Sequence, residues 1–308
     1  MKNLIITGGL GFIGKNYYLS IRDKWEKIII IDKVTYAADY EYFLTIKREK
    51  DEVIIGDITD IDFLEKNIKK ESIVIHFAAE SHVDNSFKSS LIFSKTNSYG
   101  THTLLEVCRN KSINKFIMIS TDEVYGESSL PCNESSPMAP SNPYAASKAG
   151  ADLIAQSYYK SFNVPIIIVR PNNLYGPRQN AEKIIPAIIR AINSGKKLSI
   201  HGKGETSRFF LHVNDFNSAL NLIIKKGKNG EIFNINGSNK YKIIDLISEA
   251  ANYKGIPINN FAEFVKDRPF NDQLYVVNGE KIKSLGWIEK ENFIKSFFSL
   301  IDKKSFIQ

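Results

Sequence analysis

The sequence is poor in cysteine: Cys108 and Cys132 are the two among 308 residues, and they form no Cys-x-x-Cys pair. This spacing excludes a disulfide framework and a cysteine-rich zinc site. A chain of this length buries most of the surface that its unfolded form exposes, so it needs no disulfide or metal to hold its core. We therefore predict a fold held by packing alone, with no metal site.

Long hydrophobic runs are also absent. The longest are four or five residues, as in Ile28–Ile31 and Ile166–Val169, whereas a helix that crosses a bilayer needs roughly 20. The apolar start at Leu4–Ile6 is too short for a signal peptide. We expect a protein with no membrane partner, in a reducing, cytoplasmic location.

Charge is the third feature that excludes a class of partner. Lysine and arginine number 41 and aspartate and glutamate 34, a net charge of +7. A basic balance suits nucleic acid or an anionic small molecule. The lysines are scattered rather than grouped in a basic block, which is typical of a solvated surface. We therefore expect no nucleic-acid partner.

The first half of the chain alternates short β-branched runs with helical segments. The runs are apolar throughout, which predicts strands of a parallel sheet covered on both faces. They are Asn3–Thr7, Lys27–Ile31, Glu52–Ile55, Ser72–Phe77, Lys115–Ser120 and Pro165–Val169. The helical segments are Phe12–Lys24, Asp60–Lys70, Ser89–Asn110 and Pro143–Phe162. This alternation predicts an α/β fold with a doubly wound parallel sheet, whose ligands bind at the carboxyl ends of the strands.

The pattern changes after about residue 170. Turn-rich stretches appear, followed by shorter helical segments at Glu182–Ser194, Asn214–Lys226, Ile243–Lys254 and Asn292–Ile301. We predict a first domain over residues 1–170, with return segments around 209–235. Residues 171–308 form mainly a smaller C-terminal lobe that carries the substrate-binding side of the site.

The strongest motif is Thr7-Gly8-Gly9-Leu10-Gly11-Phe12-Ile13-Gly14, which follows a strand and opens a helix. Glycines at 8, 11 and 14 allow a tight turn and a close approach of backbone N–H groups to a pyrophosphate. Asp32 ends the second strand, where a carboxylate accepts hydrogen bonds from ribose hydroxyls and repels a 2′-phosphate. The motif predicts NAD rather than NADP as the cofactor, and a Rossmann fold for residues 1–170.

Two further motifs carry reactive side chains. Tyr144 and Lys148 share one face of a helix that Asn142 or Ser141 can cap, and an ammonium near a phenol lowers the phenol pKa. Asp122 and Glu123 follow the fifth strand, at the edge where α/β sheets bind ligands. The alternative for the two acids is a solvated loop in which Asp122 caps a helix.

Together these residues resemble the extended short-chain dehydrogenase/reductase family and, within it, the nucleotide-sugar 4,6-dehydratase branch. The resemblance covers nearly the whole chain and includes Asp32–Ala37, Ala78–Asp84, Asn97-x-x-Gly100-Thr101, Arg170-x-x-Asn173-x-Tyr175-Gly176-Pro177, Glu182–Pro186, Gly202-x-Gly204-x-x-x-Arg208, Asp267-Arg268-Pro269 and Leu285-Gly286-Trp287. Thr121-Asp122-Glu123 separates this branch from the 4-epimerases, which carry small residues there, and from the decarboxylases, which lack the aspartate.

The resemblance implies an NAD-dependent conversion of dTDP-glucose or UDP-glucose to the 4-keto-6-deoxy sugar. Tyr144, with Lys148, would take the C4 hydroxyl proton, and Thr121 would hydrogen-bond that hydroxyl. Glu123 would be the base at C5, and Asp122 the acid that releases the C6 hydroxyl as water. The hydride would return to C6, so the cofactor is regenerated.

The resemblance also implies the binding residues. For the cofactor these are Gly8, Gly11, Phe12, Ile13, Gly14, Asp32, Lys33, Thr35, Asp57, Ile58, Ala78, Ala79, Ser81, Asn97, Tyr144, Lys148 and Asn173. For the nucleotide-sugar substrate they are Ser81, His82, Thr121, Asp122, Glu123, Asn173, Lys183, Arg208 and Arg268. His76, on an apolar strand, is expected to be a hydrogen-bonded core histidine instead.

Several positions depart from the branch's pattern and leave alternatives open. They are Asn172, Arg178–Ala181 and Phe270–Asn271, and they leave the choice between dTDP and UDP undecided. A 4-epimerase or decarboxylase, and a non-catalytic NAD-binding or RNA-binding relative, are the other candidate functions. A homodimer built on Ser89–Asn110 and Pro143–Phe162 is the expected assembly.

Overall fold

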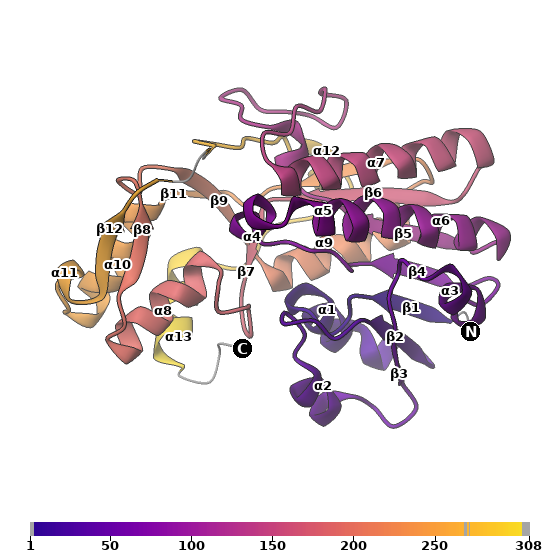
Figure 1. Cartoon of the computed structure of the whole chain (residues 1–308), viewed down its shortest axis with the longest axis horizontal. Helices are drawn as coiled ribbons and strands as arrows, with labels where there is room; N and C mark the ends of the chain where they lie inside the picture. The colour runs from indigo at the N-terminus through magenta and orange to yellow at the C-terminus, as the bar shows by residue number, and fades with distance from the viewer. Residues whose placement is uncertain (1–2, 268–269, 271, 304–308) are drawn as a thin grey trace.

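The computed structural model describes residues 3–267, 270 and 272–303. Within these residues, seven strands form a parallel sheet in the order β10-β6-β5-β4-β1-β2-β3 (Figure 1). The strands are β1 (Leu4–Thr7), β2 (Ile28–Asp32), β3 (Glu52–Ile55), β4 (Ile73–His76), β5 (Lys115–Ile119), β6 (Ile166–Pro171) and β10 (Ile232–Ile235). The predicted doubly wound parallel sheet is confirmed, and each of the six predicted strands lies within two residues of its expected bounds.

Alternate side chains of these strands enter two separate cores. Ile6 and Ile30 pack with Phe216 beneath one face, while Ile5 and Phe116 pack beneath the other. The side chains on both faces of each strand are therefore apolar, because helices cover both faces of the sheet. The first core holds α1 (Phe12–Ile21), α9 (Val213–Lys226) and α12 (Glu280–Ser284), and the second holds α3 (Ile61–Asn67), α6 (Gly100–Asn110) and α7 (Pro143–Phe162).

Helix α7 begins and ends as its sequence predicts. The side chain of Asn142 accepts a hydrogen bond from the Ala145 N–H at 2.9 Å, and Pro143 occupies the first turn. The helix ends at Asn163, which adopts a left-handed conformation with φ 56°. This cap fixes where Tyr144 and Lys148 lie relative to the end of β5.

The predicted single helix over Ser89–Asn110 is interrupted. The backbone bends at Ser89 (φ −144°, ψ 60°), after α4 (Val83–Lys88), and then passes through α5 (Ser90–Phe93) and a π-helical turn, η2 (Ser94–Tyr99), before α6. Asn97 lies in this turn, where its side chain bonds the backbone of Glu80 at 2.8 and 2.9 Å. Wide turns of this kind are frequent at functional sites.

The C-terminal lobe has its own core. Its elements are β7 (Asn173–Tyr175), α8 (Ile184–Ser194), β8 (Leu198–His201), β9 (Ser207–His212), β11 (Asn239–Lys242), α10 (Ile243–Lys254), α11 (Ile258–Phe261), β12 (Ala262–Val265) and α13 (Phe293–Asp302). Phe293 packs its ring against Tyr175 at 5.0 Å and Phe210 at 5.4 Å between centroids. The lobe therefore packs around an aromatic centre separate from the large sheet.

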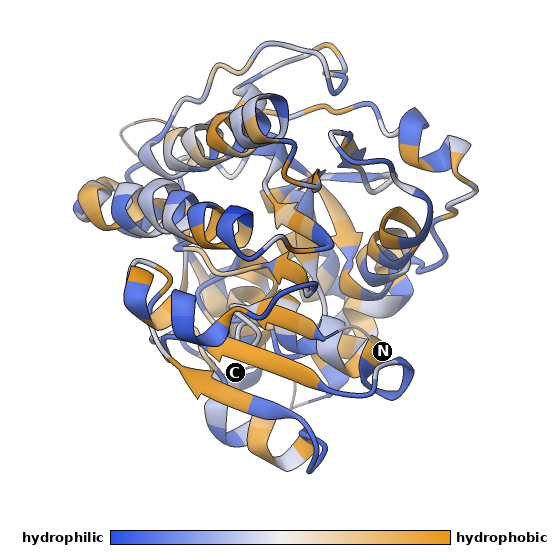
Figure 2. Cartoon of the chain, turned by 90° about the vertical axis from the view of Figure 1, so that its right-hand side faces the viewer, coloured by the Kyte–Doolittle hydropathy of each residue, from blue (hydrophilic) through white to orange (hydrophobic). Residues whose placement is uncertain are grey.

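The remaining short elements are η1 (Arg22–Lys24), α2 (Tyr40–Ile46) and η3 (Asp122–Tyr125), which follow α1, β2 and β5 along the chain. Figure 2 shows mostly apolar strands between helices that carry both apolar and polar residues. Among the helices described, none combines the length and apolar character that a membrane crossing needs. Residues 213–226 (α9) and 232–235 (β10) come after the first elements of the lobe in the sequence. They nevertheless belong to the large domain: β10 is a strand of the large sheet, and α9 packs against that sheet.

Candidate active site

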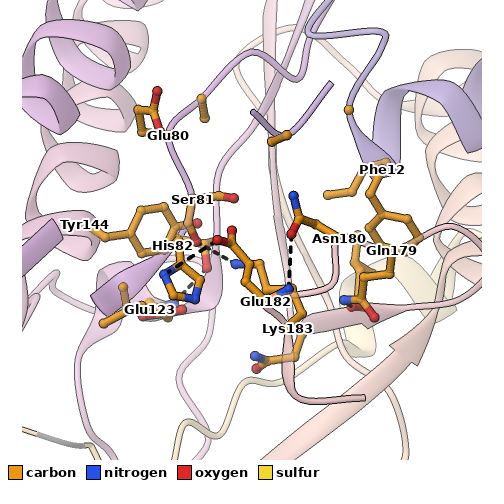
Figure 3. A pocket seen from close by; sticks show the side chains of 18 of the residues that line it. Phe12, Glu80, Ser81, His82, Glu123, Tyr144, Gln179, Asn180, Glu182 and Lys183 are labelled. Atoms are coloured by element: carbon orange, nitrogen blue, oxygen red, sulfur yellow. Dashed lines mark hydrogen bonds and ion pairs between the residues drawn. The ribbon is translucent and has the colours of Figure 1, made fainter. Parts of the chain in front are cut away.

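A cavity of about 430 Å³ opens at the carboxyl edge of the large sheet, against the lobe. The loops after β1, β2, β4, β5 and β6 line one side, and residues of α8, β8 and β9 line the other. This is the edge at which doubly wound sheets bind ligands. Figure 3 shows Tyr144, Glu123 and His82 on one side of the cavity and Phe12 and Gln179 on the other.

Nearly all the residues predicted for the site line this one cavity. Asn97 lies behind the wall instead: it is 1% exposed, and its amide is used by Glu80 and by Ser147 Oγ at 2.9 Å. It therefore shapes the cavity through its neighbours and is not available to a ligand. Arg268 lies outside the described residues.

The glycine turn packs too closely on neighbouring backbone to carry side chains at Gly8 and Gly14. Gly8 has φ 69°, and a Cβ there would lie 2.4 Å from the Ala78 nitrogen. A Cβ on Gly14 would lie 2.4 Å from the Gly8 oxygen. The glycines therefore allow the tight turn and the close helix–strand packing that a dinucleotide-binding turn requires.

Asp32 lies at the far end of the same turn. One of its carboxyl oxygens accepts from the Leu10 N–H at 3.0 Å and the other from the Val34 N–H at 2.9 Å. Burial raises the pKa of Asp32, and these backbone bonds act in the opposite direction. Next to it, Lys33 and Asp57 form an ion pair at 2.6 Å. The donors, the acid and the glycine turn together fit a dinucleotide.

The two acids of the cavity differ in their surroundings. Asp122, 2% exposed, receives the Asn172 amide at 2.6 Å and the Thr121 hydroxyl at 3.2 Å. Burial, and then the charge of Glu123, raise the pKa of Asp122 to about 7. Glu123 is less buried, and Asn142 donates to it at 3.3 Å. Burial raises the pKa of Glu123 as well, and Arg208 and Lys183 lower it.

Tyr144 and Lys148 lie one turn apart on α7, but their contacts differ from the prediction. Lys148 is 4% exposed and donates to the Ile119 carbonyl at 2.7 Å. Burial lowers the pKa of Lys148 to about 8. Burial and the charge of Glu123 raise the pKa of Tyr144, and a hydrogen bond with Thr121 lowers it. The predicted lowering of the phenol pKa by Lys148 is wrong for this structure, because the ammonium is held by a backbone carbonyl.

The cations of the lobe reach the cavity from two elements. Arg208 on β9 donates to the Asp272 carbonyl at 2.9 Å and lies over the Tyr275 ring at 4.9 Å. Lys183, just before α8, donates to the Ser81 carbonyl at 2.7 Å. Both lower the pKa of Glu123, so their positive charge is felt across the cavity.

Histidines 76 and 82 lie in different environments. His76 is 1% exposed and bonds Thr7 Oγ1 at 2.7 Å and Thr101 Oγ1 at 2.9 Å. Burial lowers its pKa to about 3, so it is neutral, and its predicted role in the core is confirmed. His82 lines the cavity, with Asp84 and Glu182 each at 3.9 Å from its ring. Figure 3 shows Glu182 next to His82.

The contacts of several polar residues in the cavity could not be predicted from the sequence. Asn142 was predicted as a helix cap, but its second contact, with Glu123, was not. Asp272 accepts from Ser141 at 2.6 and 2.7 Å and from the Tyr275 hydroxyl. Asn172 was noted only as a departure from the family pattern. Their roles depend on contacts between distant segments, which no local spacing signals.

Comparisons with known proteins agree with this geometry. Residues 5–297 match the model of the family described as GDP-mannose 4,6 dehydratase. The chain is 38% identical to the dTDP-D-glucose 4,6-dehydratase of Dictyostelium discoideum over 93% of this chain and 78% of that protein. It is also 38% identical to a trifunctional UDP-glucose 4,6-dehydratase/UDP-4-keto-6-deoxy-D-glucose 3,5-epimerase/UDP-4-keto-L-rhamnose-reductase of Arabidopsis thaliana, over 95% of this chain and 46% of that longer protein.

Among solved structures, the dTDP-glucose 4,6-dehydratase DesIV of Streptomyces venezuelae, with NAD and TYD bound, superposes with a TM-score of 0.94. It is 32% identical, and the alignment covers 97% of this chain and 96% of that one. The family match, these relatives and the shared fold lead to one assignment. The chain belongs to the nucleotide-sugar 4,6-dehydratase family of extended short-chain dehydrogenases/reductases.

Proposed function

We propose that the protein converts dTDP-glucose or UDP-glucose to the 4-keto-6-deoxy sugar, with NAD as a cofactor that is regenerated in each turnover. The observation that carries this proposal is the pair of unlike acids, Asp122 and Glu123, in the same cavity as Tyr144. An oxidation and return at C4 alone needs no acid or base at C5 and C6. Two carboxyl groups with different surroundings suit a proton removal and a proton delivery on one substrate.

The residues that would hold NAD are those of the glycine turn together with Asp32, the Lys33–Asp57 pair and Lys148. Bound NAD supplies an acceptor for the C4 hydrogen of the hexose and, later, the donor for C6. Asp32 favours NAD because its carboxylate would repel the extra phosphate of NADP. The neutral walls formed by Phe12, Ile13 and Ala78 add apolar contact to these polar groups.

Tyr144 and Thr121 act at the C4 hydroxyl. Tyr144 acts as the phenolate, which accepts the hydroxyl proton as the hydrogen leaves C4, and Thr121 bonds the same oxygen. A ketone then forms at C4, which acidifies the hydrogen at C5. Lys148, buried one helix turn away, donates to the Ile119 carbonyl, so we assign it to holding the cofactor rather than to the phenol.

Glu123 and Asp122 then act on the adjacent carbons. Glu123 removes the C5 proton, while Asp122 gives its proton to the C6 hydroxyl, which leaves as water. The atoms balance: one proton goes to Glu123, one comes from Asp122, and a C5–C6 double bond remains until a hydride reaches C6 and a proton reaches C5. An acid with a pKa of about 7 is half protonated at neutral pH, which suits this delivery.

The nucleotide would lie against the lobe. Arg208 can bind a diphosphate through its planar guanidinium, and Lys183 serves as a point charge. Asn173, Ser81 and His82 line the cavity between these cations and the acids. The nucleotide is dTDP or UDP, because relatives named for each are equally similar in sequence.

We also propose residues 1–170, with returns around 209–235, as the NAD-binding domain and 171–308 as mainly the substrate-binding lobe. The homodimer on Ser89–Asn110 and Pro143–Phe162 and the cytoplasmic location stay predictions. Sedimentation that gave a stable monomer at micromolar concentration would reject the dimer.

The test is to incubate the protein with dTDP-glucose and with UDP-glucose without added reductant, and then to make each mixture alkaline. The expected 4-keto-6-deoxy product absorbs near-ultraviolet light and appears with at least one of the two substrates. A galactose isomer would instead indicate a 4-epimerase. An unchanged substrate in both mixtures would leave the proposal without support and favour a binding protein.

A further inference from the structure

Asn172 is a buried amide that contacts the acid of the site from another strand. It directly follows β6, and its backbone N–H donates to the Ile235 carbonyl at the end of β10, at 3.0 Å. Its side chain is nearly buried, at 4% exposure, and its Nδ2 donates to Asp122 Oδ2 at 2.6 Å. Two neighbouring strands therefore fix this amide against one oxygen of the carboxyl.

We propose that Asn172 is a positioning residue that fixes the orientation of the Asp122 carboxyl and decides which of its oxygens carries the transferable proton. The inference rests on the proposed role of Asp122 as the acid for the C6 hydroxyl. An oxygen that accepts a short bond from an amide is the less basic of the two. The proton therefore resides on Oδ1, whose bond with the Thr121 hydroxyl is longer and weaker, at 3.2 Å against 2.6 Å.

The charged groups around Asp122 shift its pKa but do not fix the orientation of its carboxyl. Glu123 raises its pKa, Arg208 lowers it, and Tyr144 lies close enough for the charges of both acids to raise the phenol pKa. Burial is the largest cause of the raised pKa of Asp122, and the bonds from Asn172 and Thr121 oppose it. Removing the amide donor thus has two effects: the pKa of Asp122 rises further, and the carboxyl keeps only the longer Thr121 bond to hold its orientation.

The two effects act on one step of the reaction. Hydride removal at C4 depends on Tyr144 and Thr121, which do not use the Asn172 amide. Water elimination depends on delivery of a proton from a fixed oxygen of Asp122, and small misplacements of such groups reduce rates strongly. Loss of the amide should therefore slow elimination and leave C4 oxidation unchanged.

The test compares Asn172→Leu with Asn217→Leu. Asn217 is a matched control: it is 3% exposed, its Nδ2 donates to the Asn16 backbone carbonyl at 3.1 Å, and it lies on α9 away from the cavity. One measurement is the titration of the Asp122 carboxyl by NMR of carbon-labelled protein, assigned with Asp122→Asn. The other is the rate of C4 oxidation and of elimination in a single turnover.

We expect Asn172→Leu to raise the pKa of Asp122 by about one unit, the value of one hydrogen bond to a charged group. Elimination at neutral pH should fall about tenfold, with C4 oxidation within about twofold of the wild-type rate. Asn217→Leu should lower the melting temperature and change neither the titration nor the split between the two rates. An unchanged Asp122 titration in Asn172→Leu, or an equal loss of both rates, would overturn the proposal.

Asn172→Asp keeps the shape of the side chain and covers the case in which the leucine variant is unstable. Two carboxyl groups at this distance cannot both ionise, so Asp122 should hold its proton to higher pH than in the wild type. An unshifted titration in this variant would also overturn the proposal. The titration needs no substrate. A wild-type protein that makes no keto sugar would thus refute the proposed function, while the shift still tests the role of the amide.

Discussion

Glu123→Gln separates the oxidation at C4 from the elimination at C5 and C6. Glutamine has the shape of glutamate and can still accept the Asn142 hydrogen bond, which is 3.3 Å long. The variant loses only the charge and the basicity of the carboxylate. A lost general base costs typically 10²–10⁴-fold, about 3–5 kcal/mol, in the step that it serves.

The structure also predicts which step is spared. The charge of Glu123 raises the pKa of Tyr144. Its removal makes the phenol easier to ionise, so proton removal from the C4 hydroxyl should not slow. In a single turnover with the accepted sugar nucleotide in heavy water, the reduced cofactor should accumulate and be visible by its near-ultraviolet absorbance. Deuterium should not enter C5.

The matched control is Glu127→Gln, on the exposed loop that follows η3. The Glu127 carboxylate accepts a hydrogen bond from the Gln273 backbone N–H at 3.0 Å. The activity of the Glu127→Gln variant should therefore equal that of the wild type. Deuterium that enters C5 of the Glu123→Gln product at the wild-type rate would refute the assignment of Glu123 as the base.

Three further predictions concern pH and the cofactor. Elimination needs Asp122 protonated and Glu123 ionised. The elimination rate should therefore rise with pH as Glu123 ionises, and fall as pH rises through about 7, the raised pKa of Asp122. An elimination rate that stayed constant from pH 6 to 9 would contradict the role of Asp122 as the acid. Gly14→Ala places a Cβ 2.4 Å from the Gly8 oxygen. We expect calorimetry to show NAD binding at least about tenfold more weakly, a loss of ~1.4 kcal/mol of binding free energy. An equal affinity would show that the turn does not contact the cofactor. Asp32→Ala removes the charge that repels a 2′-phosphate, so the ratio of NADP to NAD affinity should rise about tenfold or more, and an unchanged ratio would contradict the role of this acid.

The sequence predicted the sheet well because its strands are short, apolar and separated by clear turns. Ile28–Asp32 and Ile166–Pro171 have no polar alternation, so neither could form an edge with one wet face. The helix over Ser89–Asn110 was predicted without its interruption. The π-helical turn depends on Asn97 bonding the Glu80 backbone, a contact between segments that are 17 residues apart.

The site was predicted by residue type more fully than by contact. Gly8, Asp32 and Tyr144 carry local signals, and they line the cavity together. The contact between Asn172 and Asp122 joins residues 50 apart, through the pairing of β5 with β6. The hydrogen bond of Lys148 to the Ile119 carbonyl also depends on how α7 packs on the sheet, so the phenol pKa could not be predicted from the Tyr-x-x-x-Lys spacing alone.

The central claim is that one cavity removes a hydride from C4 and returns it to C6 of the same hexose, with water lost in between. The most direct measurement is the fate of deuterium placed at C4 of the accepted sugar nucleotide, followed by NMR of the product in ordinary water. We predict deuterium at C6 and a solvent hydrogen at C5 of the 4-keto-6-deoxy sugar. Deuterium lost to solvent, or retained at C4 of an isomerised sugar, would contradict it.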